Sequence, residues 1–156
     1  MPETYPREIT EDLVDDNGVG PAPRDDERVQ NSDRFQQLRE MLQERVEWDD
    51  PILLPYAENL YVVAKSADDW VIKCECGQEF CAHDENWKRE ALINVRDTDE
   101  EYREIYPEGM HPEPEYMELR EFFCPGCHTL LEVTNVMPGR PPVHELEPDI
   151  ETFCEQ

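Results

Sequence analysis

The stretches KCECGQEFC at residues 73–81 and FCPGCH at residues 123–128 decide the fold of this chain. The second stretch is a Cys-Pro-x-Cys turn, which directs two thiolates at one ion while backbone amides donate hydrogen bonds to the sulfurs. In the first stretch, Cys74 and Cys76 are two positions apart, so they share one face of a strand. A turn at Gly77 then lets both reach the same ion. Two distant thiol pairs therefore predict a single tetrahedral metal site.

The thiolates predicted to bind the ion are those of Cys74, Cys76, Cys124 and Cys127. Because five nearby cysteines compete for four places, Cys81 is the alternative ligand, and His83 and His128 rank below it. Four thiolates without an open coordination position make a structural zinc site, not a catalytic one. Such a site contributes roughly 10–16 kcal/mol to the folding of small peptides.

Three other interpretations of these cysteines remain open at the level of sequence. They could be buried free thiols in a reduced core. The Cys-x-x-Cys turn at residues 124–127 could act in redox chemistry, although no helix pattern follows it to lower a thiolate pKa. Iron in a rubredoxin-like four-cysteine site would make the protein an electron carrier.

Short β-type runs surround both cysteine clusters. A helix is expected to start near residues 31–33 and to end before Pro51, and a second, short acidic helix is expected over residues 98–105. The runs predicted as strands cover residues 52–54, 60–64, 70–74, 91–95, 118–123 and 129–133. We therefore predict a mainly β, α+β fold: a small zinc-ribbon-like core of β-hairpins with peripheral short helices and extended acidic arms.

The composition along the chain suggests three segments. Residues 1–30 carry acidic clusters broken by Gly and Pro and have few apolar side chains, so this arm is expected to be disordered alone. Residues 31–137 form the predicted zinc-binding domain. Residues 138–156 are proline-rich and acidic, which predicts an extended C-terminal tail.

The charge of the chain excludes several classes of partner. With 39 acidic and 14 basic residues, the formal net charge is −25. Such a surface repels phosphate backbones and anionic membranes, so neither nucleic acid nor a membrane is an expected partner. Neither a secretory signal nor a run of membrane-spanning length is found, which predicts a cytoplasmic protein. In that compartment, cysteines are better explained by metal binding than by disulfides.

No self-contained active site is found in the sequence. The Gly-rich stretch at residues 18–20 lacks the lysine and helix start of a phosphate-binding loop, and no Ser/His/Asp arrangement is present. The tryptophans Trp48, Trp70 and Trp87 are either core residues or anchors of an interface with a partner. The sequence thus combines a predicted metal site with large surfaces of mixed polar and apolar character. This combination is typical of a binding or structural subunit.

Several motifs in one order give the chain a family resemblance over about residues 33–153. They are ER at 44–45, WDD at 48–50, CECG at 74–77, NWK at 86–88, VRDT at 95–98, EIYP at 104–107, RE at 120–121, FCP at 123–125 and PDIE at 148–151. In these motifs the chain resembles the gamma subunits of acetone carboxylases, and related small subunits occur in acetophenone carboxylase. One departure is His128, which stands where the family usually has Gly after the second cysteine turn.

The resemblance implies a small, non-catalytic, zinc-holding subunit of an ATP-dependent ketone carboxylase, a ligase complex. Its partners would be two larger subunits in a dimer of heterotrimers. These large subunits, with ATP and a divalent metal, would join a ketone and bicarbonate into a β-keto acid. The resemblance does not identify the ketone. The residues alone leave a free-standing zinc-ribbon adaptor as the alternative.

Overall fold

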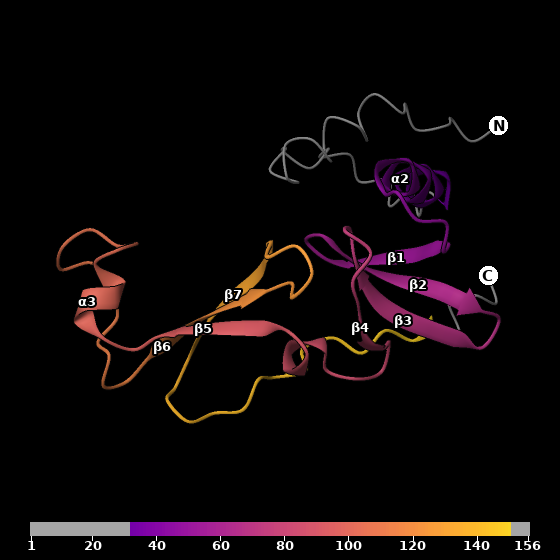
Figure 1. Ribbon diagram of the computed structural model, residues 1–156. Coiled ribbons are helices and arrows are strands. Elements are labelled where there is room, and N and C mark those ends of the chain that lie inside the picture. The colour runs from indigo at the N-terminus through magenta and orange to yellow at the C-terminus, as the bar shows by residue number, and fades with distance from the viewer. Residues whose placement is uncertain (1–31, 151–156) are drawn as a thin grey trace, which may run out of the picture.

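The computed structural model describes residues 32–150, which form two antiparallel sheets and a few short helices (Figure 1). The arm predicted over residues 1–30 and the end of the predicted tail lie outside the described residues. The helical elements are α2 (Ser32–Arg45), the short 3-10 helix η1 (Trp87–Arg89) and α3 (Asp99–Tyr102). The strands are β1 (Ile52–Ala57), β2 (Leu60–Ser66), β3 (Asp69–Cys74), β4 (Glu79–Ala82), β5 (Leu92–Arg96), β6 (Glu118–Phe123) and β7 (Leu130–Val136).

The first sheet has the strand order β1-β2-β3-β4, with β2 and β3 in the middle. Side chains of an antiparallel pair that stand opposite each other share a face of the sheet. Leu60 therefore lies beside Cys74 on one face, while Tyr61 and Val63 lie on the other. All three of these β2 side chains are buried, so both faces of the sheet are covered.

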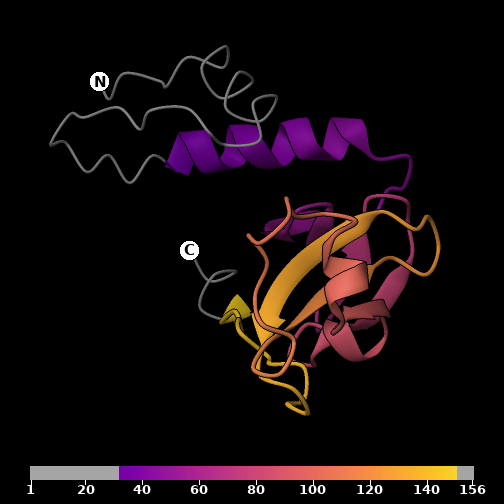
Figure 2. The same ribbon diagram turned by 90° about the vertical axis from the view of Figure 1, so that its left-hand side faces the viewer.

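Helix α2 covers one face of this sheet and crosses above β1 (Figure 2). Its Leu42 packs with Ile52, Tyr61 and Val63 in one buried cluster. The helix is also tied to β1 by polar contacts, since the Arg39 Nε donates to the Ile52 carbonyl at 2.9 Å. The apolar stripe of the helix is therefore part of the core.

The second sheet, β5-β6-β7, meets the first at a shared core. This core joins Leu60 and Ile72 of the first sheet to Phe122 and Leu131 of the second, with Trp87 between them. Trp87 contacts Phe122 edge-on, at 6.0 Å between ring centroids. The sheets are therefore held together by a common set of aromatic and aliphatic side chains.

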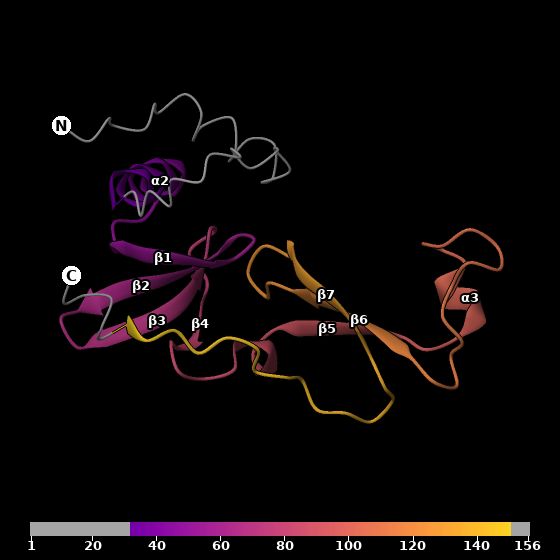
Figure 3. The same ribbon diagram turned by 180° about the vertical axis from the view of Figure 1, so that it is seen from behind.

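After β7, the chain turns back and runs without regular structure along the first sheet (Figures 1 and 3). The Tyr56 hydroxyl donates to the Leu146 carbonyl at 2.5 Å, and the Asn86 amide donates to the Pro142 carbonyl at 3.0 Å. Ile150 at its end is fully buried. The extended segment is thus packed against the sheet. No helix within residues 32–150 is long and apolar enough to cross a membrane.

The predicted fold class is confirmed: the protein is mainly β, with hairpins, few short helices and a cysteine cluster compatible with a zinc ribbon. Every predicted strand is present. Strand β4 and η1 were not predicted, and α3 covers only Asp99–Tyr102 of the helix expected over residues 98–105. The predicted division into arm, domain and tail is not tested by these features and stays a prediction.

Candidate metal centre

Four cysteine sulfurs from the two stretches meet where the two sheets join. They belong to Cys74, Cys76, Cys124 and Cys127, and all lie within 4.8 Å of one another. The Cys74 and Cys127 sulfurs are 3.9 Å apart, and those of Cys76 and Cys124 are 3.7 Å apart. Zn–S bonds of about 2.3 Å in a tetrahedron place sulfurs about 3.8 Å apart. The cluster therefore has the size of a tetrahedral four-thiolate site.

The first pair is positioned by a tight turn after β3. The Cys74 N–H donates to the Gln78 carbonyl and the Gly77 N–H donates to the Cys74 carbonyl, both at 2.8 Å. Gly77 has a φ of 96°, and a Cβ there would lie 3.3 Å from the Trp48 ring. Glycine therefore suits this turn both by its backbone angle and by its lack of a side chain. The Trp48 Nε1 holds the turn from outside by donating to the Glu75 carbonyl at 2.9 Å.

The second pair lies in the turn between β6 and β7. The Gly126 N–H donates to the Cys124 sulfur at 3.4 Å, and the His128 N–H donates to the Cys124 carbonyl at 2.9 Å. His128 has a φ of 60°, a left-handed angle at which an L-residue is strained and glycine is not. The second cysteine turn thus adopts this left-handed angle although histidine, and not glycine, stands at the position.

Burial and hydrogen bonding shift the pKa of three of the four thiols, in different directions. Burial raises the pKa of Cys74 well above its usual range and also raises that of Cys76. For Cys127, burial also raises the pKa. Hydrogen bonds with the Thr129 side chain and backbone, and with Cys76 and Cys124, outweigh burial and lower the pKa to about 7. With their raised pKa values, the thiols of Cys74 and Cys76 keep their protons at neutral pH unless a cation lies beside them. A dication that deprotonates its thiol ligands fits this arrangement.

The other predicted ligands lie elsewhere. The Cys81 sulfur is outside the cluster, 3.5 Å from the Glu85 carbonyl, and lines a separate cavity of about 490 Å³ together with His144. The His83 ring packs edge-on against Trp70, at 5.2 Å between centroids. His128 is exposed, and within residues 32–150 the metal-sized cluster contains the four cysteines alone.

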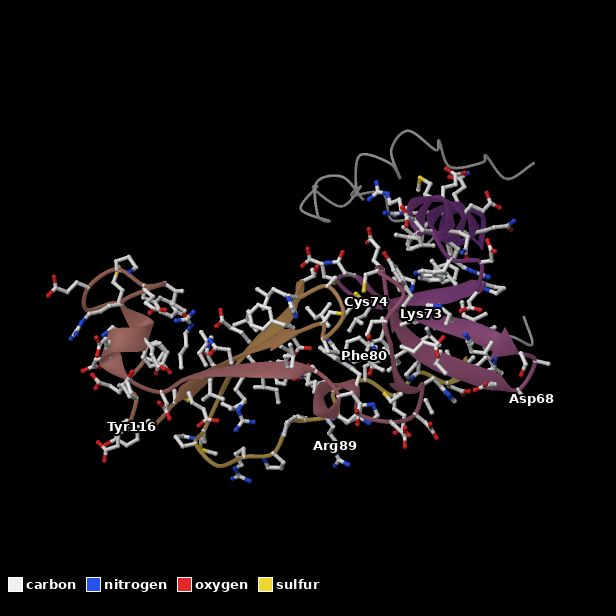
Figure 4. The ribbon with its side chains drawn as sticks, in the orientation of Figure 1. Asp68, Lys73, Cys74, Phe80, Arg89 and Tyr116 are labelled. Carbon is white, nitrogen blue, oxygen red and sulfur yellow. The ribbon has the colours of Figure 1, made fainter. Side chains whose placement is uncertain are left out.

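The position of the cluster is visible in Figure 4, where Cys74 lies at the junction of the two sheets, close to Phe80. Cys74 and Cys124 are buried members of the shared core, whereas the residues Cys76 and Cys127 are exposed. One side of the cluster therefore belongs to the interior and the other faces a shallow cavity of about 330 Å³, lined in part by Arg45 and Asn59. An ion here would tie the two sheets together.

Two supporting residues were not predicted from the sequence. Thr129 lies two positions after Cys127, and its Oγ1 is 3.2 Å from that sulfur. Its position directly after the second cysteine turn is the sequence signal from which Thr129 could have been predicted. Trp48 had no comparable signal, because its contact with Glu75 joins residues 27 positions apart. Of the tryptophans, Trp87 is a core residue, while Trp48 and Trp70 are half-buried.

The fold and the cluster define a small, acidic, mainly β protein whose two sheets meet at a four-cysteine centre. Residues 46–156 match the family model described as the acetone carboxylase gamma subunit, and the chain belongs to that family. It is 44% identical to the acetone carboxylase gamma subunit of Xanthobacter autotrophicus over 125 residues, which is 80% of this chain and 74% of the relative. It is 28% identical to the acetophenone carboxylase beta subunit of Aromatoleum aromaticum over 82 residues, 51% of this chain and 63% of that relative.

Proposed function

We propose that this chain is the small zinc-binding subunit of an ATP-dependent ketone carboxylase complex of the acetone carboxylase type. The observation that carries the metal part of this proposal is the cluster of four sulfurs within 4.8 Å at the joint of the two sheets. The relatives, which are subunits of acetone and acetophenone carboxylases, support the membership in a carboxylase complex.

In this proposal, Cys74, Cys76, Cys124 and Cys127 hold one structural Zn²⁺. The ion would stabilise the packing of one sheet on the other, because two ligands come from each sheet's hairpin. Four thiolates leave no open position for substrate or water, so the ion would not take part in the reaction. Cys81 would stay a free thiol.

The reaction belongs to the larger subunits in this proposal. Two kinds of larger subunit would bind ATP and a divalent metal and carboxylate the ketone with bicarbonate, and the complex would be a cytoplasmic dimer of heterotrimers. The small subunit would contribute binding surfaces and no catalytic residue. Which ketone is carboxylated would be decided by pockets of the larger subunits.

The proposal is tested by co-expressing this chain with the two kinds of larger carboxylase subunit from the same organism. We expect a stable complex that carboxylates a ketone with ATP, and one equivalent of zinc per small subunit by mass spectrometry. Cys76→Ser should lose the zinc, and Cys81→Ser, the matched control, should keep it. A chain that purifies alone under native conditions would support the free-standing adaptor instead.

The geometry of the cluster also suits iron, because a tetrahedron of four thiolates accepts either metal. An iron-loaded, rubredoxin-like electron carrier is therefore the second candidate. It predicts a visible absorption band and iron in the purified protein. A colourless protein with zinc alone would exclude this candidate.

A further inference from the structure

The large apolar side chains that are exposed to solvent all lie in the second half of the described chain. Within residues 34–150, every large apolar side chain that is exposed comes from Leu92 or a later residue. Strands β1 to β4 carry none of them. The three-stranded sheet carries five of them: Leu92, Ile93 and Val95 on its edge strand β5, and Leu130 and Val133 on its other edge strand β7.

Strand β5 is exposed on both of its faces. Leu92 on one face is 48% exposed, and Ile93 and Val95 on the other are 41% and 38% exposed. An edge strand with one face in the core normally exposes polar side chains on the other. Apolar side chains on both faces are typical of a strand whose two faces are both covered.

The outer edge of β5 lacks the usual protection against pairing. Natural edge strands carry proline, lysine, bulges or a covering element. Strand β5 has neither proline nor lysine, and its pairing with β6 has no register shift. Its one basic side chain, Arg96, is bound within the subunit by Glu121 and Glu104. Among the described residues, no strand pairs with this outer edge (Figure 1).

The other sheet edges are protected. Strand β1 contains Pro55, has register shifts against β2 and is packed against α2. Strand β4 has four residues. Strand β7 alternates polar side chains such as Glu132 and Thr134 with apolar ones, and its pairing with β6 contains a shift. The bare β5 edge is therefore a local feature of this molecule.

The charge around β5 indicates the kind of occupant. Exposed carboxylates flank the strand, with Glu90 before it and Asp97 and Asp99 after it. A second copy of this chain would bring the same carboxylates to the contact, and each chain carries a net charge of −25. A partner strand with apolar side chains and basic residues around it would complement both the apolar side chains of β5 and the carboxylates that flank it.

We infer that the β5 edge (Leu92–Arg96) is the docking site for a β-strand of a larger carboxylase subunit, which extends the sheet β7-β6-β5 by one strand. The incoming strand has apolar side chains that contact Leu92 on one face and Ile93 and Val95 on the other, and lysine or arginine at its ends. Backbone hydrogen bonds to β5 supply register and affinity. This inference rests on the proposed function, because it takes the larger subunits as the partner.

The test compares Leu92→Lys and Val95→Lys on the two faces of β5 with the control Val133→Lys. Val133 shares the face of Leu92, is 46% exposed and lies on the opposite edge strand β7. All three variants should keep their zinc and melting temperature, since the side chains are exposed. Both β5 variants should bind the larger subunits at least about tenfold more weakly, and Val133→Lys should change binding less than about twofold.

Hydrogen exchange supplies the measurement that is specific to strand pairing. Amides of residues 92–96 that face outward should exchange rapidly in the free full-length chain and slowly in the complex, while those on the outer edge of β7 should not change. Slow exchange in the free monomer would mean that another segment of this chain covers β5. A dimer of the isolated chain that Val95→Lys dissociates would mean that a second copy does. Either result would overturn the inference.

The outcomes also separate this inference from the proposed function. If the wild-type chain binds the larger subunits and Leu92→Lys and Val95→Lys bind equally well, the docking site is wrong and the function stands. If Leu92→Lys alone weakens binding, a face of the sheet docks and the edge does not, which also overturns the inference. If the wild-type chain does not bind the larger subunits at all, both proposals are overturned.

Discussion

Replacing Cys124 by serine gives the sharpest test of the metal centre. Its sulfur is fully buried, lies 3.7 Å from that of Cys76 and belongs to the core that joins the two sheets. If four thiolates share the roughly 10–16 kcal/mol that zinc contributes to small domains, losing one removes about 2.5–4 kcal/mol. This is a large part of a total stability of about 5–15 kcal/mol.

The matched control is Cys81→Ser. Cys81 is half-buried and lies outside the sulfur cluster, and a serine hydroxyl can keep the hydrogen bond of its side chain to the Glu85 carbonyl. At about 4 °C per kcal/mol, Cys124→Ser should lower the melting temperature by about 10 °C or more, and Cys81→Ser by less than about 4 °C. Calorimetry with and without a chelator, together with metal content, measures both. Equal melting temperatures and equal metal content in the two variants would refute the reasoning.

Three further changes test the packing, the alkaline limit and the second cysteine turn. Phe122→Ala should lower the free energy of unfolding by about 3–5 kcal/mol in urea titrations, because this ring is fully buried between the sheets; a loss below about 1 kcal/mol would contradict the shared core. Burial, followed by negative charge at Cys81, Glu132 and other acids, raises the pKa of Tyr56 from 10.0 to about 12. The neutral hydroxyl therefore stabilises the folded protein below pH 10, and this stabilisation is lost as the pH rises through 12. Tyr56→Phe should therefore flatten the decline of melting temperature over this pH window, and an unchanged slope would show that other groups cause it. His128→Gly should raise stability by up to about 1 kcal/mol, since φ is 60° there, and should leave the metal content unchanged; loss of metal would instead identify the imidazole as a ligand.

Local patterns were sufficient to predict most of the elements. The β-branched and aromatic runs of β2, β3 and β6 predicted strands because such side chains suit a pleated, half-buried surface. Strand β4 was missed because its apolar run, residues 80–82, is only three residues long and overlaps the first cysteine stretch. These residues form a strand only because β3 offers a partner.

The sulfur cluster was also anticipated from residue spacing, and the four sulfurs that lie together belong to the preferred set Cys74, Cys76, Cys124 and Cys127. What the spacing did not explain is why Cys81, the alternative ligand, lies outside it. Cys81 lies closer in sequence to Cys76 than either cysteine of the second turn does, and yet it lies outside the cluster. Strand β4 carries it away from the first turn and against the core, where it contacts Glu85. The position of Cys81 outside the cluster therefore depends on the path of strand β4, which the local sequence did not predict.

The sequence alone determined the mainly β class, the two cysteine turns and the strong negative charge. The first two depend on residues that are close together in the chain, and the charge depends on composition alone. Only the tertiary structure decided that Lys88, on a short turn, is buried beside Phe122 and paired with Glu132, 44 positions away. It also decided that β5 ends a sheet with apolar side chains on both faces. Such features arise from contacts between distant segments, and no local sequence pattern predicts those contacts.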